Sequence, residues 1–358
     1  MQEFRGRKKL NLTRDKVVID FRERPREKAG NLSGQYPHVV NDYLYWQLAS
    51  PSDICYAKKE ESGYVKPTDN IIIKNSLASQ NFRVFYDTNP NCKPDERYKA
   101  VGGYHVGKTH EVVKNCEVSK KATQIWVQDH VWPETTKGLF EDDYSHPRHA
   151  NGIYVFKSSD GLDWELHHDL PILSEFTNMD PDPIVGCDTM PSIFYDDNIG
   201  EYVLYVRCNI RLGVRHVLYT KSKDLVNWDK PILINKEPSF DMDHENLYYL
   251  CASRYPNSNK YIAFPPHFKN EILSPNGSNR RYYETKTLVM VSDDGINWKV
   301  IDQILDKEYN QHMRQPHVVS FREEGDEYAL YVHEGYWTQS GKLVRYTVDK
   351  NELDNLVL

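Results

Sequence analysis

The sequence lacks the long apolar runs of a membrane protein. No stretch of its 358 residues approaches 18 consecutive apolar side chains, so we expect no membrane-spanning helix and no membrane partner. Residues 1–16 are basic at their start but have no apolar segment and no small-residue cleavage site behind them. This pattern does not predict a secretory signal, and a cytoplasmic location is therefore the default expectation.

Features of nucleic-acid-binding proteins and of zinc proteins are also absent. The 45 Lys and Arg residues are outnumbered by 52 Asp and Glu, for a net charge of −7, and the basic residues are scattered, so nucleic acid is not expected as a partner. The six cysteines form no Cys-x-x-Cys pair, which indicates free thiols rather than a zinc site. No long segment has the 3.6-residue apolar period of a helix, and this argues against an α/β enzyme.

Tyrosine is abundant, with 25 Tyr against 12 Phe and 7 Trp, a composition that suits half-buried β-strands. Three segments share one pattern, in which a strand leads to Ser-x-Asp and a Trp follows four residues after the Asp. They are residues 154–164, 218–228 and 289–298. Asp and Gly at such a position favour a hairpin turn, so we interpret Asp160, Asp224 and Asp294 as structural.

A second unit precedes each of these copies, in which an apolar strand and a short polar turn lead to a strand of the form Tyr-x-x-Tyr. Residues 192–207 and 318–333 match in register, and looser copies begin near residues 37, 82 and 246. The repeat predicts an all-β fold, a five-bladed β-propeller with four-stranded antiparallel blades that start near residues 37, 82, 190, 246 and 316. Separate β-sandwiches remain the alternative.

The propeller is expected to be a single domain over residues 1–358. Blade 2 contains a long loop insertion over residues 106–151, a length typical of a lid, a binding element or an interface. The last blade has little chain left for an outer strand, so we expect residues 16–21 to supply that strand and close the ring.

Blade topology separates structural acids from functional ones. Chain direction alternates from strand to strand, so the hairpins after the first and third strands lie on one face of the propeller, and all other connections lie on the opposite face. Asp87 falls at a hairpin after a first strand and is interpreted as structural. On the opposite face, acidic, basic and aromatic residues precede the first strands and follow the second strands.

These residues are the predicted site. The candidate catalytic carboxylates are Asp188, Glu245 and Glu334. The candidate substrate-binding residues are His105, Asp182, Arg207, His267, His317, His333 and Trp337. Carboxylates beside aromatic rings and Arg or His donors suit a sugar, because glycosidic cleavage needs one protonated and one ionised carboxyl group. No cofactor is expected, except that the acids would suit a structural Ca²⁺ at the axis.

The Ser-x-Asp-Gly-x-x-Trp units and the segments 188–196 and 202–207 resemble the five-bladed propeller glycosidases of families 32, 43, 68, 117 and 130. The resemblance is nearest to uncharacterised proteins described as like the family 32 N-terminal domain, and it covers residues from about 30 to 350. It implies that Asp188 acts as base or nucleophile and that Glu245 or Glu334 acts as the acid. The strings W-M-N-D-P-N-G, R-D-P and E-C are absent, which argues against a true fructosidase.

Three functions are consistent with these residues. The first is a glycoside hydrolase acting on an oligosaccharide or polysaccharide. The second is a glycoside phosphorylase that holds phosphate with groups such as Arg207, Arg211, His267 and His333. The third is a propeller that binds carbohydrate without cleaving it. Sugar identity, linkage, stereochemical outcome and oligomeric state do not follow from the sequence.

Overall fold

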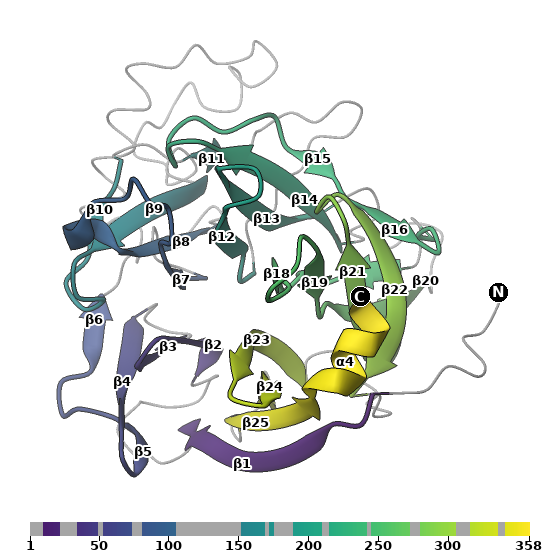
Figure 1. Ribbon diagram of the computed structural model, residues 1–358, viewed down its shortest axis with the longest axis horizontal. Helices are drawn as coiled ribbons and strands as arrows, with labels where there is room; N and C mark the ends of the chain where they lie inside the picture. The colour runs from purple at the N-terminus through teal and green to yellow at the C-terminus, as the bar shows by residue number, and fades with distance from the viewer. Residues whose placement is uncertain are drawn as a thin grey trace.

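The architecture is an all-β propeller. The computed structural model describes residues 10–21, 34–48, 53–73, 81–104, 152–168, 172–174, 189–209, 215–241, 245–272, 280–305, 316–335 and 341–358. Strands from these ranges form five hydrogen-bonded sheets arranged around a common centre (Figure 1). No helix within these ranges is both long and apolar enough to cross a membrane.

The first two sheets come from the N-terminal half of the chain. Sheet I contains β2 (Gln35–Val40), β3 (Tyr43–Gln47), β4 (Ile54–Glu60), β5 (Gly63–Val65) and β6 (Ile71–Ile73). Sheet II contains β7 (Arg83–Tyr86), β8 (Tyr98–Tyr104), β9 (Gly152–Ser158), β10 (Glu165–Leu166) and β11 (Leu173–Ser174), and a short 3₁₀ helix (Pro94–Glu96) precedes β8. The predicted insertion, residues 106–151, falls between β8 and β9 and lies outside the described residues.

The other three sheets follow in chain order. Sheet III contains β12 (Ser192–Asp196), β13 (Glu201–Asn209), β14 (Arg215–Ser222) and β15 (Ile232–Leu233). Sheet IV contains β16 (Asn235–Glu237), β17 (Glu245–Leu247), β18 (Ala252–Arg254), β19 (Tyr261–Ala263), β20 (Pro266–Ile272), β21 (Arg280–Ser292) and β22 (Asn297–Ile304). Sheet V contains β23 (His317–Glu324), β24 (Glu327–Glu334), β25 (Lys342–Asp349) and β1 (Thr13–Asp20).

Sheets I, II and IV depart from the predicted pattern of four antiparallel strands. In sheet I, two short strands, β5 and β6, share β4 as their partner. In sheet IV, β16 pairs with β22 in parallel, because the chain runs alongside this outer strand before it turns in toward the centre. The innermost strand of the same sheet is interrupted between β17 and β18, where Cys251 adopts a φ of 48°. In sheet II, two short strands, β10 and β11, share β9 as their partner.

The N-terminal strand closes the ring, as the sequence predicted. β1 pairs antiparallel with β25 and is the outermost strand of sheet V (Figure 1). Ile19 on this strand and the flanking Leu10 and Phe21 are buried in the largest apolar cluster. The first and last parts of the chain are thus joined by backbone hydrogen bonds and by apolar contact.

The sequence did not predict the C-terminal helix α4 (Lys350–Val357). The Asp349 side chain caps it by accepting a hydrogen bond from the Glu352 backbone N–H at 3.1 Å. Leu353 and Val357, four residues apart, are the buried residues of the helix. This spacing is a helical signal, but eight residues at the chain end are too few for a sustained period.

The three repeated acids hold turns, which confirms their structural interpretation. Asp160 Oδ1 accepts hydrogen bonds from the backbone N–H groups of Leu162 and Asp163 at 2.8 and 2.9 Å. Asp224 and Asp294 accept the same pair of bonds in their own turns. These bonds favour the charged carboxylates, and they lower the pKa of Asp224 to about 2 against the opposing effect of burial.

Asp87 is also structural, and its partner comes from the neighbouring sheet. Its carboxylate is fully buried and accepts a hydrogen bond from the Tyr202 hydroxyl on β13 at 2.9 Å. Asp196, at the same position of sheet III, accepts a hydrogen bond from the hydroxyl of Tyr261 on β19. Such pairs stabilise the contact between neighbouring sheets, because a buried carboxylate needs a donor.

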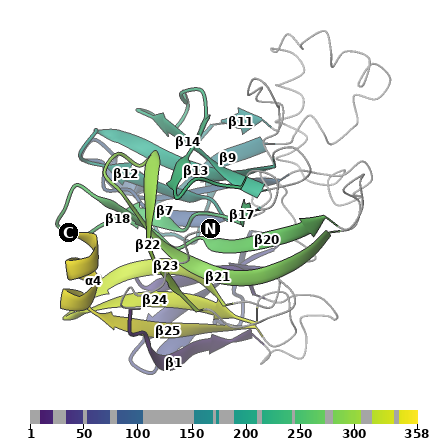
Figure 2. The same ribbon diagram turned by 90° about the vertical axis from the view of Figure 1, so that its right-hand side faces the viewer.

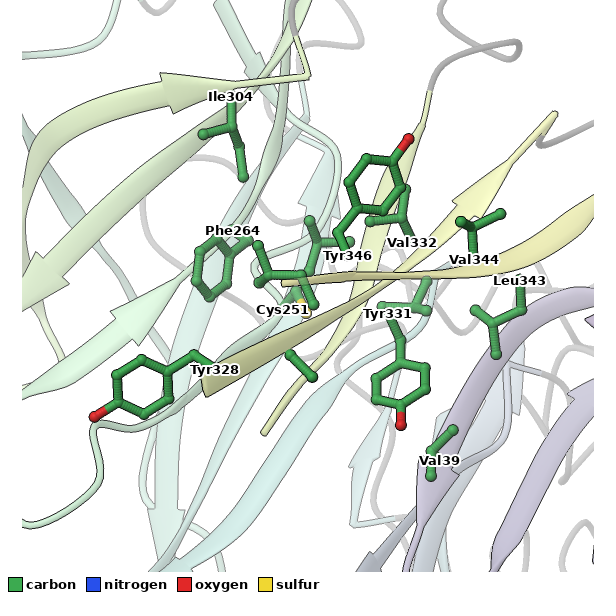
Figure 3. Packing of buried hydrophobic residues seen from close by; sticks show 14 of the residues in the cluster. Val39, Cys251, Phe264, Ile304, Tyr328, Tyr331, Val332, Leu343, Val344 and Tyr346 are labelled. Atoms are coloured by element: carbon green, nitrogen blue, oxygen red, sulfur yellow. The ribbon is translucent and has the colours of Figure 1, made fainter. Parts of the chain in front are cut away.

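The core is divided among several apolar clusters between the sheets. The largest includes Val332 and Val344 of sheet V together with Phe264 and Cys251 of sheet IV (Figure 3). We call the face at which β3, β8, β13, β20 and β24 end the mouth face. Figure 2 shows β20 ending toward this face and α4 lying at the opposite one. The first strands begin at the mouth face, because each pairs antiparallel with a strand that ends there.

Candidate functional site at the mouth face

Six of the predicted site residues are described. Five of them lie at strand ends on the mouth face, whereas His267 lies near the start of β20, away from the end of that strand. Glu245 and His317 begin the inner strands β17 and β23. The other four lie at or near the ends or starts of second strands, namely Arg207 on β13, His267 on β20, and His333 and Glu334 on β24. Asp188, Asp182, His105 and Trp337 lie outside the described residues.

Glu245 is a largely buried carboxylate with two basic neighbours. Its side chain is 16% exposed, and its carboxylate lies 3.6 Å from Lys236 Nζ and 3.8 Å from His267 Nε2. The Asp241 backbone N–H donates to its Oε2 at 3.3 Å. The Lys236 distance is that of an ion pair without a short hydrogen bond, so Lys236 acts on Glu245 mainly through its electrostatic field.

These neighbours decide the protonation state of Glu245. Burial alone would raise its pKa, but His267, the Lys236 ammonium group and the Asp241 backbone N–H lower the pKa to about 2. Glu245 is therefore ionised at neutral pH. An ionised carboxylate fits a base or nucleophile and does not fit the general acid of a glycosidase, which must hold a proton.

His267 is neutral at neutral pH in this arrangement. Its imidazole is 7% exposed, and burial lowers its pKa even though the Glu245 carboxylate acts in the opposite direction. Glu245 Oε1, at 3.8 Å, is too far for a direct hydrogen bond. A neutral imidazole beside a carboxylate can still donate or accept a hydrogen bond with a ligand hydroxyl.

Two guanidinium groups lie over the ring of Tyr248. Arg207 and Arg215 are placed together by the pairing of β13 with β14, and their Cζ atoms lie 5.2 and 5.8 Å from the Tyr248 ring centroid. The Arg215 guanidinium also lies 5.9 Å from the centroid of Phe268. Arg207 is buried and stays charged, because arginine does not lose its proton in proteins. Near the mouth face, two guanidinium groups therefore pack against buried aromatic rings.

His317 and His333 are paired on neighbouring strands of sheet V. His317 packs against Tyr248 and Tyr249, with ring centroids 6.0 and 5.7 Å away. His333 packs edge-on against Phe21, and burial lowers its pKa to about 3. His333 is therefore neutral at neutral pH and supplies no positive charge for a phosphate group.

Glu334 has partners that give it a structural role. Its carboxylate forms a two-pronged ion pair with Arg14 of β1, with both N–O distances at 3.0 Å. It also accepts a hydrogen bond from the Tyr346 hydroxyl at 2.6 Å. This arrangement fastens the closing strand to β24 and β25, and an Arg held at both nitrogens is geometrically well defined.

Sheet I contributes polar residues that are not among the predicted site residues. Gln35 and Gln47 face each other at the mouth end of β2 and β3, and both are buried. Gln47 Oε1 accepts a hydrogen bond from the Asn81 backbone N–H at 2.7 Å. Its Nε2 has no hydrogen-bond partner among the described residues. Gln47 ends a second strand, so the rule that selected Arg207 would also have selected it.

Lys236 and Arg215 were missed for a different reason. Lys236 lies outside the strand ends considered, on β16, and reaches Glu245 only because that strand joins sheet IV from its outer edge. Arg215 begins a third strand, and the predicted site includes only residues before first strands and at the ends of second strands. No group of three His, Cys, Asp or Glu side chains within the described ranges is placed to hold a metal ion.

Comparison with known proteins gives structural likenesses only. No family model matches the sequence, and no curated protein does. The fold is similar to an N-acetylgalactosamine deacetylase from F. plautii in complex with blood group B trisaccharide, at 10% identity and a TM-score of 0.46. That match covers 97% of this chain and 98% of the other.

Two glycosidases are similar to a comparable degree. One is the GH93 α-L-arabinofuranosidase of Fusarium graminearum in complex with arabinobiose, at 12% identity and a TM-score of 0.46, with 94% of this chain and 98% of the other covered. The other is the GH32 β-fructofuranosidase of Bombyx mori, at 12% identity and a TM-score of 0.49, with 90% and 62% covered. At these values we infer no shared activity and transfer no residue role.

Proposed function

We propose that this protein is a glycoside hydrolase whose active site is the mouth face of the propeller. The observation that carries the proposal is Glu245, a carboxylate largely withdrawn from water and held ionised at the start of an inner strand. Tyr248, Arg207 and His267 bring aromatic and donor groups from neighbouring strands to the same face. These donors can hold the hydroxyl groups of a sugar bound at this face.

In this proposal the roles of the carboxylates change from those the resemblance implied. Glu245 acts as the base or nucleophile, because its neighbours favour the ionised form. The proton donor is then Asp188, which precedes β12 by four positions in the sequence. Glu334 is assigned to the closure of the ring through Arg14. The separation of the two carboxyl groups sets whether configuration is retained or inverted.

The proposal also includes the other predicted substrate-binding residues and the blade count. His317 and His333 would support the floor of the site, and His105, Asp182 and Trp337 would contribute from the mouth-face connections. We propose that each of the five sheets is one blade. The partner is a carbohydrate, and the reaction proposed here uses protein side chains alone.

The test measures reducing-sugar release from a panel of oligosaccharides and polysaccharides in phosphate-free buffer. E245Q and D188N should each lower kcat by at least about 100-fold, the loss typical when a catalytic carboxylate is removed. The matched control is E201Q: Glu201 is also largely buried and ion-paired to a lysine, Lys221, but lies at the hairpin end of β13. Full activity in E245Q and D188N would refute the proposal.

A second candidate, a glycoside phosphorylase, is favoured by one observation. Arg207 and Arg215 place two permanent positive charges over one ring at the mouth face, an arrangement suited to a phosphate dianion. The same panel with added phosphate distinguishes the candidates. Release of a sugar 1-phosphate only when phosphate is present would replace hydrolysis by phosphorolysis, and binding without cleavage in either buffer would indicate a carbohydrate-binding propeller.

A further inference from the structure

Arg83 lies where the inner strands of the propeller meet. It begins β7, the first strand of sheet II. Its Nη1 donates a hydrogen bond to the Val319 carbonyl on β23 of sheet V at 2.7 Å. The same nitrogen lies 3.4 Å from the Sδ of Met190, just before β12 of sheet III. One guanidinium thus connects three sheets across the centre of the ring.

Sheets I and IV also face this guanidinium, with side chains that carry no negative charge at neutral pH. The titratable groups that act on Arg83 within the described ranges include Cys251 and Tyr249 of sheet IV. Burial raises the pKa of the Cys251 thiol to about 11, so it remains protonated. Burial raises the pKa of Tyr249 well above its usual value, and its hydroxyl donates to the Val318 carbonyl at 3.0 Å.

His38 completes the surroundings from sheet I and is fixed in its neutral form. Its Nε2 accepts a hydrogen bond from the Val84 backbone N–H at 2.9 Å, so that nitrogen carries no proton. Its Nδ1 lies 3.0 Å from the Tyr36 carbonyl and therefore holds the proton. Burial, followed by the positive charge of Arg83, lowers the pKa of His38 well below its usual value.

The result is a permanent positive charge whose neighbours, within the part of the chain that the structure describes, are neutral. Burial lowers the pKa of Arg83, which means that desolvation disfavours its charged form, yet an arginine does not become neutral in a protein. Arg83 as a residue is partly exposed. A charge in a poorly solvated site exerts a strong field on any ion that reaches it.

We propose that the centre of the propeller binds a small monovalent anion, of the halide class, at the Arg83 guanidinium. A monovalent ion is favoured over phosphate because one guanidinium is the single cationic group that these contacts bring to the centre. The Nε and Nη2 groups of Arg83 and the Cys251 thiol are the donors that would face the ion. The same charge disfavours Ca²⁺ at this level of the axis.

The bound anion would stabilise the folded propeller, because it would neutralise the charge of Arg83, a residue of sheet II that contacts sheets III and V. Binding to the folded state alone raises stability as the ligand concentration rises. The experiment is thermal unfolding of the full chain in sodium chloride and sodium gluconate mixtures at constant ionic strength. The melting temperature should rise with chloride, and bromide should replace chloride.

The Arg83→Met variant should lose this dependence. The matched control is Arg97→Met. Arg97 also donates hydrogen bonds to backbone carbonyls, those of Asp87 and Asn89 at 3.0 and 2.7 Å, but it lies near the hairpin end of sheet II. The control should keep the chloride dependence. A wild-type melting temperature that ignores chloride, or a dependence that persists in Arg83→Met, would overturn the proposal.

Two further measurements test the proposal if Arg83→Met does not fold, and test whether the bound ion is a halide. Crystals of the wild-type protein soaked in bromide should show an anomalous peak beside the Arg83 guanidinium, and no peak there would overturn the proposal. Substituting phosphate for chloride at the same ionic strength should give less stabilisation. Stronger stabilisation by phosphate that Arg83→Met abolishes would overturn the halide assignment.

Discussion

Gly295 is the most informative single position for testing how neighbouring sheets pack. It lies in the turn between β21 and β22, with a φ of +76°. A Cβ built on it would lie 2.7 Å from the hydroxyl of Tyr205, a buried residue of sheet III. That hydroxyl donates a hydrogen bond to the Gly295 carbonyl at 2.9 Å. Gly295→Ala therefore perturbs both the turn and the contact between the two sheets.

The two effects can be given separate magnitudes. A left-handed backbone conformation costs a residue with a Cβ about 1–2 kcal/mol. Displacing the Tyr205 hydroxyl loses a hydrogen bond worth about 0.5–1.5 kcal/mol. We expect Gly295→Ala to lower the free energy of unfolding by about 1.5–3.5 kcal/mol in total. Gly325→Ala should cost the backbone part alone, because Gly325 has a φ of +62° and no atom of the described residues within 4 Å of its built Cβ.

Urea unfolding followed by tryptophan fluorescence measures these differences. In a Tyr205→Phe background, Gly295→Ala should cost no more than Gly325→Ala, because the obstructing hydroxyl is gone and the double-mutant cycle isolates the contact. If Gly295→Ala and Gly325→Ala lower the free energy of unfolding equally in the wild-type background, the contact with Tyr205 is not what requires glycine at position 295.

Three further predictions concern closure, pH and the site. Deleting residues 1–21 removes β1 and three buried apolar side chains worth about 1.5–3 kcal/mol each, and it exposes the edge of β25. Calorimetry should therefore show a much lower melting temperature or aggregation. An unchanged melting temperature would contradict the closure of the ring by β1. Because the folded-state pKa of His333 is about 3 and an unfolded histidine titrates near 6.5, the unfolded state binds the extra proton below about pH 6.5. This group should therefore cost about 1.4 kcal/mol of stability for each pH unit as pH falls from about 6.5 toward 3, and His333→Gln should reduce that slope in urea unfolding, whereas an identical slope would contradict the assignment. Lys236→Met removes a positive charge 3.6 Å from Glu245 and should shift the acidic limb of the pH–rate profile upward, and an unmoved limb would show that Glu245 is not the ionised catalytic group.

The parts of the fold that the sequence predicted depend on local chemistry or on repetition. Asp160, Asp224 and Asp294 were interpretable because the bonds they accept come from residues two and three positions away. The closing strand followed from a count of strands in the last sheet. The second copy of the turn motif has Leu225 in place of Gly, at a φ of 64°. The buried leucine side chain can offset the cost of this left-handed backbone conformation through its apolar contacts.

The parts that the sequence did not predict depend on contacts between distant segments. Glu334 is paired with Arg14, 320 residues away in the sequence, and no local pattern indicates that partner. Lys236 helps to control the ionisation of Glu245 through a parallel pairing that no repeat pattern signals. Arg83 stands in an ordinary strand sequence, and only the ring arrangement brings the carbonyl of Val319 within reach.

The separation of the Glu245 and Asp188 carboxyl groups in a crystal structure with a bound sugar is the most direct test of the proposed active site. The account predicts that the two groups flank the anomeric carbon, at about 5–5.5 Å for a retaining enzyme or about 6.5–9.5 Å for an inverting one. A sugar bound away from Glu245, or an Asp188 carboxyl group well beyond about 10 Å from it, would contradict the account.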